Sequence, residues 1–164
     1  MSLLNIDAYT GEHGLYVGAF LPENFAPQIH SLCDDLGLER LDSSELHCTV
    51  IYSRDNVVPR KNMPVIKQAV NALVTSVQHW VGHNGKTYVV ADVQSMAMCQ
   101  LHTRFSNAGA RHSFAAFRPH ITLGKLETVS DDFEDKIEAL NWKLKADPLH
   151  VAFLNITAED INPE

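Results

Sequence analysis

The sequence predicts an α+β fold in which two similar lobes make up a single domain over residues 1–164. A strand–helix–strand pattern runs from Tyr16 to His47, and a second one runs from Tyr88 to His120. Both units end in His-x-Thr, and the copies are offset by 72 residues (16 to 88) and 73 residues (47 to 120). No segment rich in Pro, Gly or Ser separates them. We interpret the pattern as a diverged internal duplication whose halves share one groove.

The periodicity of apolar residues predicts the individual elements. Alternation along residues 14–21 indicates a half-buried strand, with Tyr16 and Gly18 on its more polar face. Helical spacing follows, with Pro22 suited to the start of a helix and Gly37 suited to its end. The later elements are, in chain order, a strand over about 45–53, a hairpin ending in KTYVVADV, a helix from Ser95 to Gly109, a strand over 118–125, a helix from Ser130, and a strand pair around WKLKA and LHVAFLNI. We place lobe one at about 14–58, lobe two at about 73–125 and closing elements at 130–157.

One stretch has two interpretations. Between residues 65 and 81 the apolar residues fit both a helix and a strand. The turn sequence HNG at 83–85 precedes a clear strand, and a strand after a tight turn usually pairs with the one before it. We therefore favour a hairpin and leave residues 65–72 open.

Composition excludes several classes of protein. An apolar content of 45% and a charged content of 20% are those of a globular protein. The formal net charge is −7, so the chain gains nothing from counterion release, and we expect no binding to duplex DNA or long RNA. A small anionic ligand in a local cleft remains compatible with this charge.

The three cysteines are widely spaced and predict neither a disulfide framework nor a zinc ribbon. The N-terminus lacks the features of a signal peptide, and no apolar run has the length needed to cross a bilayer. These features predict a cytoplasmic protein that does not bind membranes. The sequence gives no indication of a protein partner.

The two His-x-Thr stretches carry the chemistry. Residues i and i+2 of a strand share a face, so His47 lies beside Thr49, and His120 lies beside Thr122. A neutral imidazole can accept a proton from an attacking 2′-hydroxyl or water, and a protonated one can donate to the departing 5′-oxygen. The threonine hydroxyls can donate hydrogen bonds to phosphoryl oxygens. This set predicts phosphodiester cleavage without a metal ion.

Candidate ligand contacts surround these strands. Tyr16 and Tyr88 occupy matching places in the two units, and the loop GARHSFAAFRPH offers Phe114 for stacking and Arg118 for a phosphate. Tyr52 and Lys125 each lie five residues after a motif histidine, so strict alternation places them on the opposite face of the strand, although Lys125 could lie at the edge of the groove. We interpret Tyr52 as a packing residue unless a bulge intervenes, and leave Lys125 out of the catalytic set.

A metal site is not expected. The chain has no H-E-x-x-H motif, and the pair His79/His83 falls near a turn without a carboxylate nearby. No glycine-rich phosphate loop or nucleophile elbow occurs either. We expect no cofactor.

The segments LHCTVIYS and RPHITLGK resemble the two-histidine phosphoesterases, a superfamily marked by paired H-x-T/S motifs on equivalent strands. The resemblance covers about residues 14–156 and implies a bilobal fold with two pseudo-symmetric antiparallel-sheet lobes around a central groove and helices outside. Together with GLYVGAF, the first motif looks like the phage anti-CBASS nuclease group. Those proteins degrade cyclic di- and trinucleotides of bacterial defence without a metal. The resemblance implies that His47, Thr49, His120 and Thr122 are catalytic.

The first hypothesis is thus a metal-independent phosphodiesterase acting on cyclic di- or trinucleotides, which would counteract bacterial CBASS immunity. A second hypothesis keeps the chemistry but acts on RNA ends that carry a 2′,3′-cyclic phosphate. A third, from another class, is a sponge that binds cyclic nucleotides without cleaving them. Two proton-transfer groups argue against the third, because a binder has no need of them.

Overall fold

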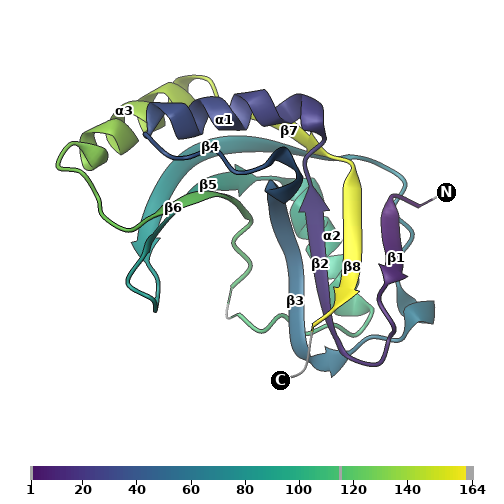
Figure 1. Cartoon of the computed structure of the whole chain (residues 1–164). Coiled ribbons are helices and arrows are strands. Elements are labelled where there is room, and N and C mark those ends of the chain that lie inside the picture. The colour runs from purple at the N-terminus through teal and green to yellow at the C-terminus, as the bar shows by residue number, and fades with distance from the viewer. Residues whose placement is uncertain (1, 115, 162–164) are drawn as a thin grey trace.

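The computed structural model describes residues 2–114 and 116–161, which form one mixed sheet with helices packed on it (Figure 1). Its strands are β1 (Leu4–Ala8), β2 (Gly14–Phe20), β3 (His47–Val57), β4 (Val70–Val81), β5 (Thr87–Gln94), β6 (His120–Leu126), β7 (Leu149–Phe153) and β8 (Asn155–Asp160). Its α-helices are α1 (Ala26–Asp35), α2 (Met96–Asn107) and α3 (Phe133–Ala146).

The sheet consists of two four-stranded halves. The strand order is β1-β8-β2-β3-β6-β5-β4-β7, and every neighbouring pair is antiparallel except β1 with β8. A single residue pair, Cys48 with Ile121, joins the halves through β3 and β6. The two strands diverge beyond this pair (Figure 1). The predicted α+β fold with two lobes is confirmed.

The central strand pairs of the two halves share the same register on one face. In the first half, side chains on one face of β2 and β3 pair across the strands, and the second half shows the same order on β5 and β6. The pairs are Tyr16–Tyr52, Gly18–Thr49 and Phe20–His47, matched by Tyr88–Lys125, Val90–Thr122 and Asp92–His120. The predicted duplication is therefore present in the strand register itself.

Two helices, α1 and α2, connect the halves because each packs across the junction. The helix α1 follows β2 of the first half but packs against β6 and α3 (Figure 1). The helix α2 follows β5 of the second half but packs against β3 and β4. Ser95 caps α2 by accepting a hydrogen bond from the Met98 N–H at 2.9 Å, as predicted. Gly37, at φ +69°, follows the end of α1, where a left-handed residue is needed.

The C-terminal quarter differs from the prediction. The segment WKLKA is the last turn of α3 and not a strand, because Leu144 extends the buried stripe of Phe133, Ile137 and Leu140. The segment LHVAFLNI does not form one strand either: it divides into β7, at one edge of the sheet, and β8, which lies between β1 and β2. The prediction also missed β1, which is short and mostly exposed.

Candidate active site

The two His-x-Thr segments lie side by side at the junction of the halves. Because Cys48 pairs with Ile121 in antiparallel register, Thr49 is the next neighbour of His120 on the groove face, and His47 is the next neighbour of Thr122. All four side chains are half-buried, whereas Cys48 and Ile121 are fully buried beneath them. The strand parity predicted from the sequence is correct for both motifs.

Both imidazoles are oriented by the same local hydrogen bond. The Nδ1 atom of His47 lies 2.7 Å from the Glu45 carbonyl oxygen, and that of His120 lies 2.8 Å from the Arg118 carbonyl oxygen. A carbonyl can only accept, so Nδ1 carries the hydrogen in each ring and Nε2 is left for proton exchange. In the described part of the chain, neither Nε2 atom has a hydrogen-bond partner.

The surroundings of the two rings differ. The ring of His47 stacks on Phe20, with centroids 5.0 Å apart and an interplanar angle of 26°. The ring of His120 meets the indole of Trp80 edge-on, at 5.7 Å and 86°. One imidazole is thus held from the first half of the sheet and the other from the second.

Tyr16 joins the site through Thr49. Its hydroxyl lies 3.2 Å from Thr49 Oγ1, and its ring is edge-on to His47 with centroids 6.5 Å apart. Burial raises the pKa of Tyr16, and the nearby Glu159 carboxylate adds to this effect, while the bond to Thr49 opposes it. Tyr16 is therefore a neutral phenol at cellular pH and can donate or accept a hydrogen bond.

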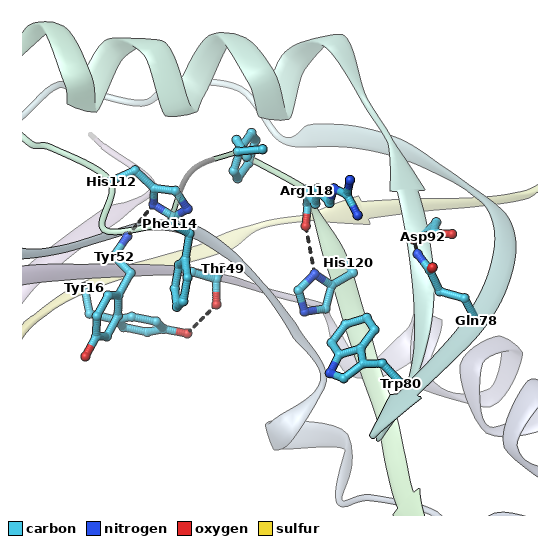
Figure 2. Close-up of a pocket in the computed structure, with 12 residues that line it drawn as sticks. Tyr16, Thr49, Tyr52, Gln78, Trp80, Asp92, His112, Phe114, Arg118 and His120 are labelled. Atoms are coloured by element: carbon cyan, nitrogen blue, oxygen red, sulfur yellow. Dashed lines mark hydrogen bonds between the residues drawn. The ribbon is translucent and has the colours of Figure 1, made fainter. Parts of the chain in front are cut away.

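A cavity of about 630 Å³ opens at this junction (Figure 2). Its volume lies in the range of small-molecule sites. Its lining combines aromatic rings, polar groups and one arginine: Tyr16, Thr49, Tyr52, Gln78, Trp80, Asp92, His112, Phe114, Ala116, Phe117, Arg118 and His120. His47 and Thr122 lie on the same face but outside this lining.

Tyr52 lines the cavity, which corrects its interpretation as a packing residue. The register of β3 against β2 slips between Thr49 and Ile51, so Val50 is an extra, bulged residue. Val50 and Ile51 are both fully buried, and the side chain of Tyr52 returns to the groove face. The consecutive pair Val50-Ile51 is the one sequence feature that could have indicated the bulge.

The same slip occurs in the second half. Leu123 is the extra residue of β6. Lys125 therefore lies opposite Tyr88 on the groove face, and not on the opposite face that strict alternation predicted. Both residues lie outside the lining of the cavity, and the Tyr88 hydroxyl accepts a hydrogen bond from Asn84 Nδ2 at 2.9 Å. The binding role predicted for Tyr88 stays a prediction.

The loop between α2 and β6 covers one side of the cavity and is hydrogen-bonded to β3. The Ser113 N–H donates to the Tyr52 carbonyl at 2.7 Å, and the Tyr52 N–H donates to His112 Nδ1 at 3.1 Å (Figure 2). Phe114 is 63% exposed, and its ring centroid lies 5.6 Å from that of Tyr52. Phe114 and Arg118 thus line the cavity, and their predicted roles in ligand binding stay predictions.

Asp92 and Gln78, two polar residues of the second half, line the cavity and were not predicted from the sequence. Asp92 accepts hydrogen bonds from Ser76 Oγ and Gln78 Nε2, both at 2.6 Å, and lines the cavity together with Gln78. Gln78 and Trp80 lie on β4, in the segment whose periodicity fits a helix as well as a strand. The favoured hairpin placed both residues on a strand, but sequence analysis did not assign them to the site.

Cys48 lies in the first His-x-Thr motif, between His47 and Thr49, and its side chain is fully buried. Burial raises the pKa of the Cys48 thiol to about 12, so it stays protonated between the two site residues that flank it. Among the described residues, no group of three or more His, Cys, Asp or Glu side chains is arranged to hold a metal ion. None of the described helices is long and apolar enough to span a membrane.

The family model described as anti-CBASS protein Acb1 matches residues 13–158. The chain belongs to this family. An Acb1 of Vibrio phage KVP40 is 28% identical over 131 residues, which cover 79% of this chain and 84% of the relative. An Acb1 of Escherichia phage RB16 is 29% identical over 124 residues, covering 73% and 68%. As an Acb1 family member, the protein counteracts CBASS.

Solved structures show that the Acb1 family chain has the fold of the two-histidine phosphoesterases. E. coli LigT in its apo form matches with a TM-score of 0.53 at 15% identity, over 89% of this chain and 85% of LigT. A structure described as a phosphoesterase matches with a TM-score of 0.54 at 14% identity, over 89% and 86%. The family model thus confirms the predicted phage anti-CBASS group, and the solved structures confirm the predicted two-histidine phosphoesterase fold.

Proposed function

We propose that this Acb1 family member cleaves a phosphodiester bond of cyclic di- or trinucleotides by acid–base chemistry of His47 and His120, without a metal ion. The observation that carries the proposal is the matched orientation of the two rings. Each Nδ1 is bound to the carbonyl two residues earlier, and each Nε2 is unbound on the same side of the β3–β6 junction. Two such groups, one from each half, suit the attacking and the leaving side of one phosphate.

In this mechanism, one neutral Nε2 accepts the proton of an attacking 2′-hydroxyl or water while the new P–O bond forms. The second histidine, protonated at Nε2, donates its proton to the 5′-oxygen as the old P–O bond breaks. Thr49 and Thr122 are next neighbours of the opposite histidines and can donate hydrogen bonds to the phosphoryl oxygens, where negative charge develops. After cleavage the first histidine is protonated and the second is neutral, so one proton has been taken up and one released.

Aromatic rings on both sides of the cavity support a nucleotide ligand. Trp80 stands beside His120, and Tyr52 with Phe114 stands on the opposite side, next to Tyr16 (Figure 2). Base–aromatic stacking contributes roughly 1–3 kcal/mol per base. A compact ligand with two or three bases fits this arrangement better than long RNA, which the net charge of −7 disfavours.

The proposal is tested by product analysis in the presence of a chelator. The protein is incubated with a cyclic dinucleotide, a cyclic trinucleotide and an RNA oligonucleotide that ends in a 2′,3′-cyclic phosphate. We expect linear products from at least one cyclic substrate and slower turnover of the RNA end. Preferential turnover of the RNA end would favour the RNA-processing alternative, and unchanged cyclic nucleotide recovered from a stable complex would favour a sponge.

A further inference from the structure

The bulge of β3 presents the Val50 carbonyl to helix α2. Val50 has no partner in the register of β3 with β2 or with β6. A bulge interrupts the ladder and bends its strand, and it persists when the freed backbone groups find other partners. The position of Tyr52 in the cavity depends on this extra residue, because without it the side chain of Tyr52 would point to the opposite face.

A side chain from α2 binds this carbonyl. The Nδ1 atom of His102 lies 2.6 Å from the Val50 carbonyl oxygen. The ring of His102 also stacks on Phe117 of the α2–β6 loop, with centroids 4.0 Å apart and planes 9° from parallel. It meets His112 edge-on at 5.0 Å. One imidazole thus connects the bulge, the helix and the loop that covers the cavity.

We propose that His102 is a positioning residue of the active site: its Nδ1–H bond to the Val50 carbonyl fixes the bulge and thereby holds Tyr52 in the cavity. His102 is absent from the cavity lining, so it acts through Val50 and Tyr52. His47 and Thr49 precede the bulge, and their pairing with β2 is in register on that side of it. Loss of the bond therefore weakens ligand binding more than the chemical step.

The second half contains the counterpart of this bond. Leu123, the bulged residue of β6, accepts a hydrogen bond at its carbonyl from Cys33 Sγ of α1 at 3.6 Å. Burial raises the pKa of Cys33 to about 11, so its thiol remains a donor. In each half, then, a helix that crosses from the opposite half binds the carbonyl of the bulged residue. This repetition indicates that the bulge contact belongs to the architecture of the site.

Two substitutions separate the hydrogen bond from the stacking. His102→Phe keeps an aromatic ring against Phe117 but has no N–H for the Val50 carbonyl. His102→Asn loses the ring but places an amide N–H near the position of Nδ1. Thr103→Val is the matched control, because Thr103 is an exposed neighbour on α2 whose hydroxyl donates to the Cys99 carbonyl of the same helix.

The kinetic readout rests on the proposed function and uses the cyclic dinucleotide. We expect His102→Phe to raise KM about tenfold, since a lone carbonyl replaces a hydrogen-bonded one, and to change kcat less than about threefold. His102→Asn and Thr103→Val should stay within about threefold of the wild type in both constants. The inference is overturned if His102→Phe leaves KM unchanged, if it lowers kcat alone, or if His102→Asn is equally impaired.

Amide hydrogen exchange gives a readout that needs no substrate. Exchange at the Tyr52 amide and at residues 111–113 should accelerate in His102→Phe and not in His102→Asn. Equal exchange in the wild type and His102→Phe overturns the inference regardless of activity. Absence of turnover by the wild-type protein counts against the proposed function alone, and the exchange experiment still decides the role of His102.

Discussion

At the scale of single residues, two short hydrogen bonds determine what His47 and His120 present to a ligand. Both rings bind the carbonyl of residue i−2 through Nδ1, so the tautomer is set by the strand that carries the histidine. Strand alternation was enough to predict that each histidine shares a face with its threonine. The ring orientation was not predictable, because it depends on the path of the two preceding residues.

Tyr52 provides a test at the same scale. Its ring centroid lies 5.6 Å from that of Phe114 and 6.4 Å from that of Tyr16, on one side of the cavity. Replacing it with Leu removes the stacking surface, and we expect KM for the cyclic dinucleotide to rise roughly fivefold or more, given about 1–3 kcal/mol per stacked base. Steady-state kinetics of Tyr52→Leu checks this, with Tyr52→Phe as the control that keeps the ring. Equal KM values for both variants would show that no base stacks there.

At the scale of elements, the α2–β6 loop depends on the protonation of His112. Its Nδ1 accepts the Tyr52 N–H, so this nitrogen must be free of a proton. Burial lowers the pKa of His112, and the neighbouring His102 lowers it further. A lowered folded-state pKa means that the stabilisation is complete above the unfolded value, about 6.5, and is lost as the pH falls through the folded value.

We therefore expect the loop to open at acidic pH. His112 is faced by His102 from α2 and by the rings of Phe114 and Phe117 from the loop. Hydrogen-exchange protection factors at residues 111–113 should decrease as the pH is lowered from about 7 to about 5. His112→Asn keeps an acceptor that does not titrate, so its protection should stay constant over the same range. The same decrease in both proteins would refute the role of His112.

The elements themselves show where sequence patterns were insufficient. WKLKA alternates apolar and lysine residues as a strand would, yet Leu144 completes a helical stripe, and packing against β4 selects the helix. Neither bulge was predicted. One extra residue leaves the alternation intact on each side of it, but it reverses the face to which all later side chains point. That single residue in each strand moved Tyr52 and Lys125 onto the groove face.

At the scale of the whole molecule, the halves are linked by crossing elements more than by the sheet. One residue pair joins β3 to β6, whereas α1 and α2 each pack on the opposite half, and the chain after α3 returns through β7 to β8 (Figure 1). The duplication was visible in the sequence because both units kept their His-x-Thr motifs. The crossing of the helices was not, because helical periodicity gives the buried face but not its partner.

This linkage predicts that the halves unfold together. Ile156 of β8 is fully buried in the first half, and its replacement by Ala should cost about 2–5 kcal/mol. Both tryptophans, Trp80 and Trp142, lie in elements of the second half or packed on it. In urea unfolding of Ile156→Ala, the fluorescence midpoint should fall together with the circular-dichroism midpoint. The exposed Val81→Ala serves as the control, and a tryptophan transition unaffected by Ile156→Ala would mean independent lobes.

The proposed mechanism requires His47 and His120 together to transfer the two protons of phosphodiester cleavage. The most direct measurement is the rate at which a cyclic dinucleotide is linearised, under chelator, by the wild type, His47→Ala, His120→Ala and the exposed-turn control His83→Ala. We expect each site variant to lose at least about 100-fold in kcat, the control to match the wild type, and the wild-type rate to be bell-shaped in pH. Full activity in either His47→Ala or His120→Ala would rule out this mechanism.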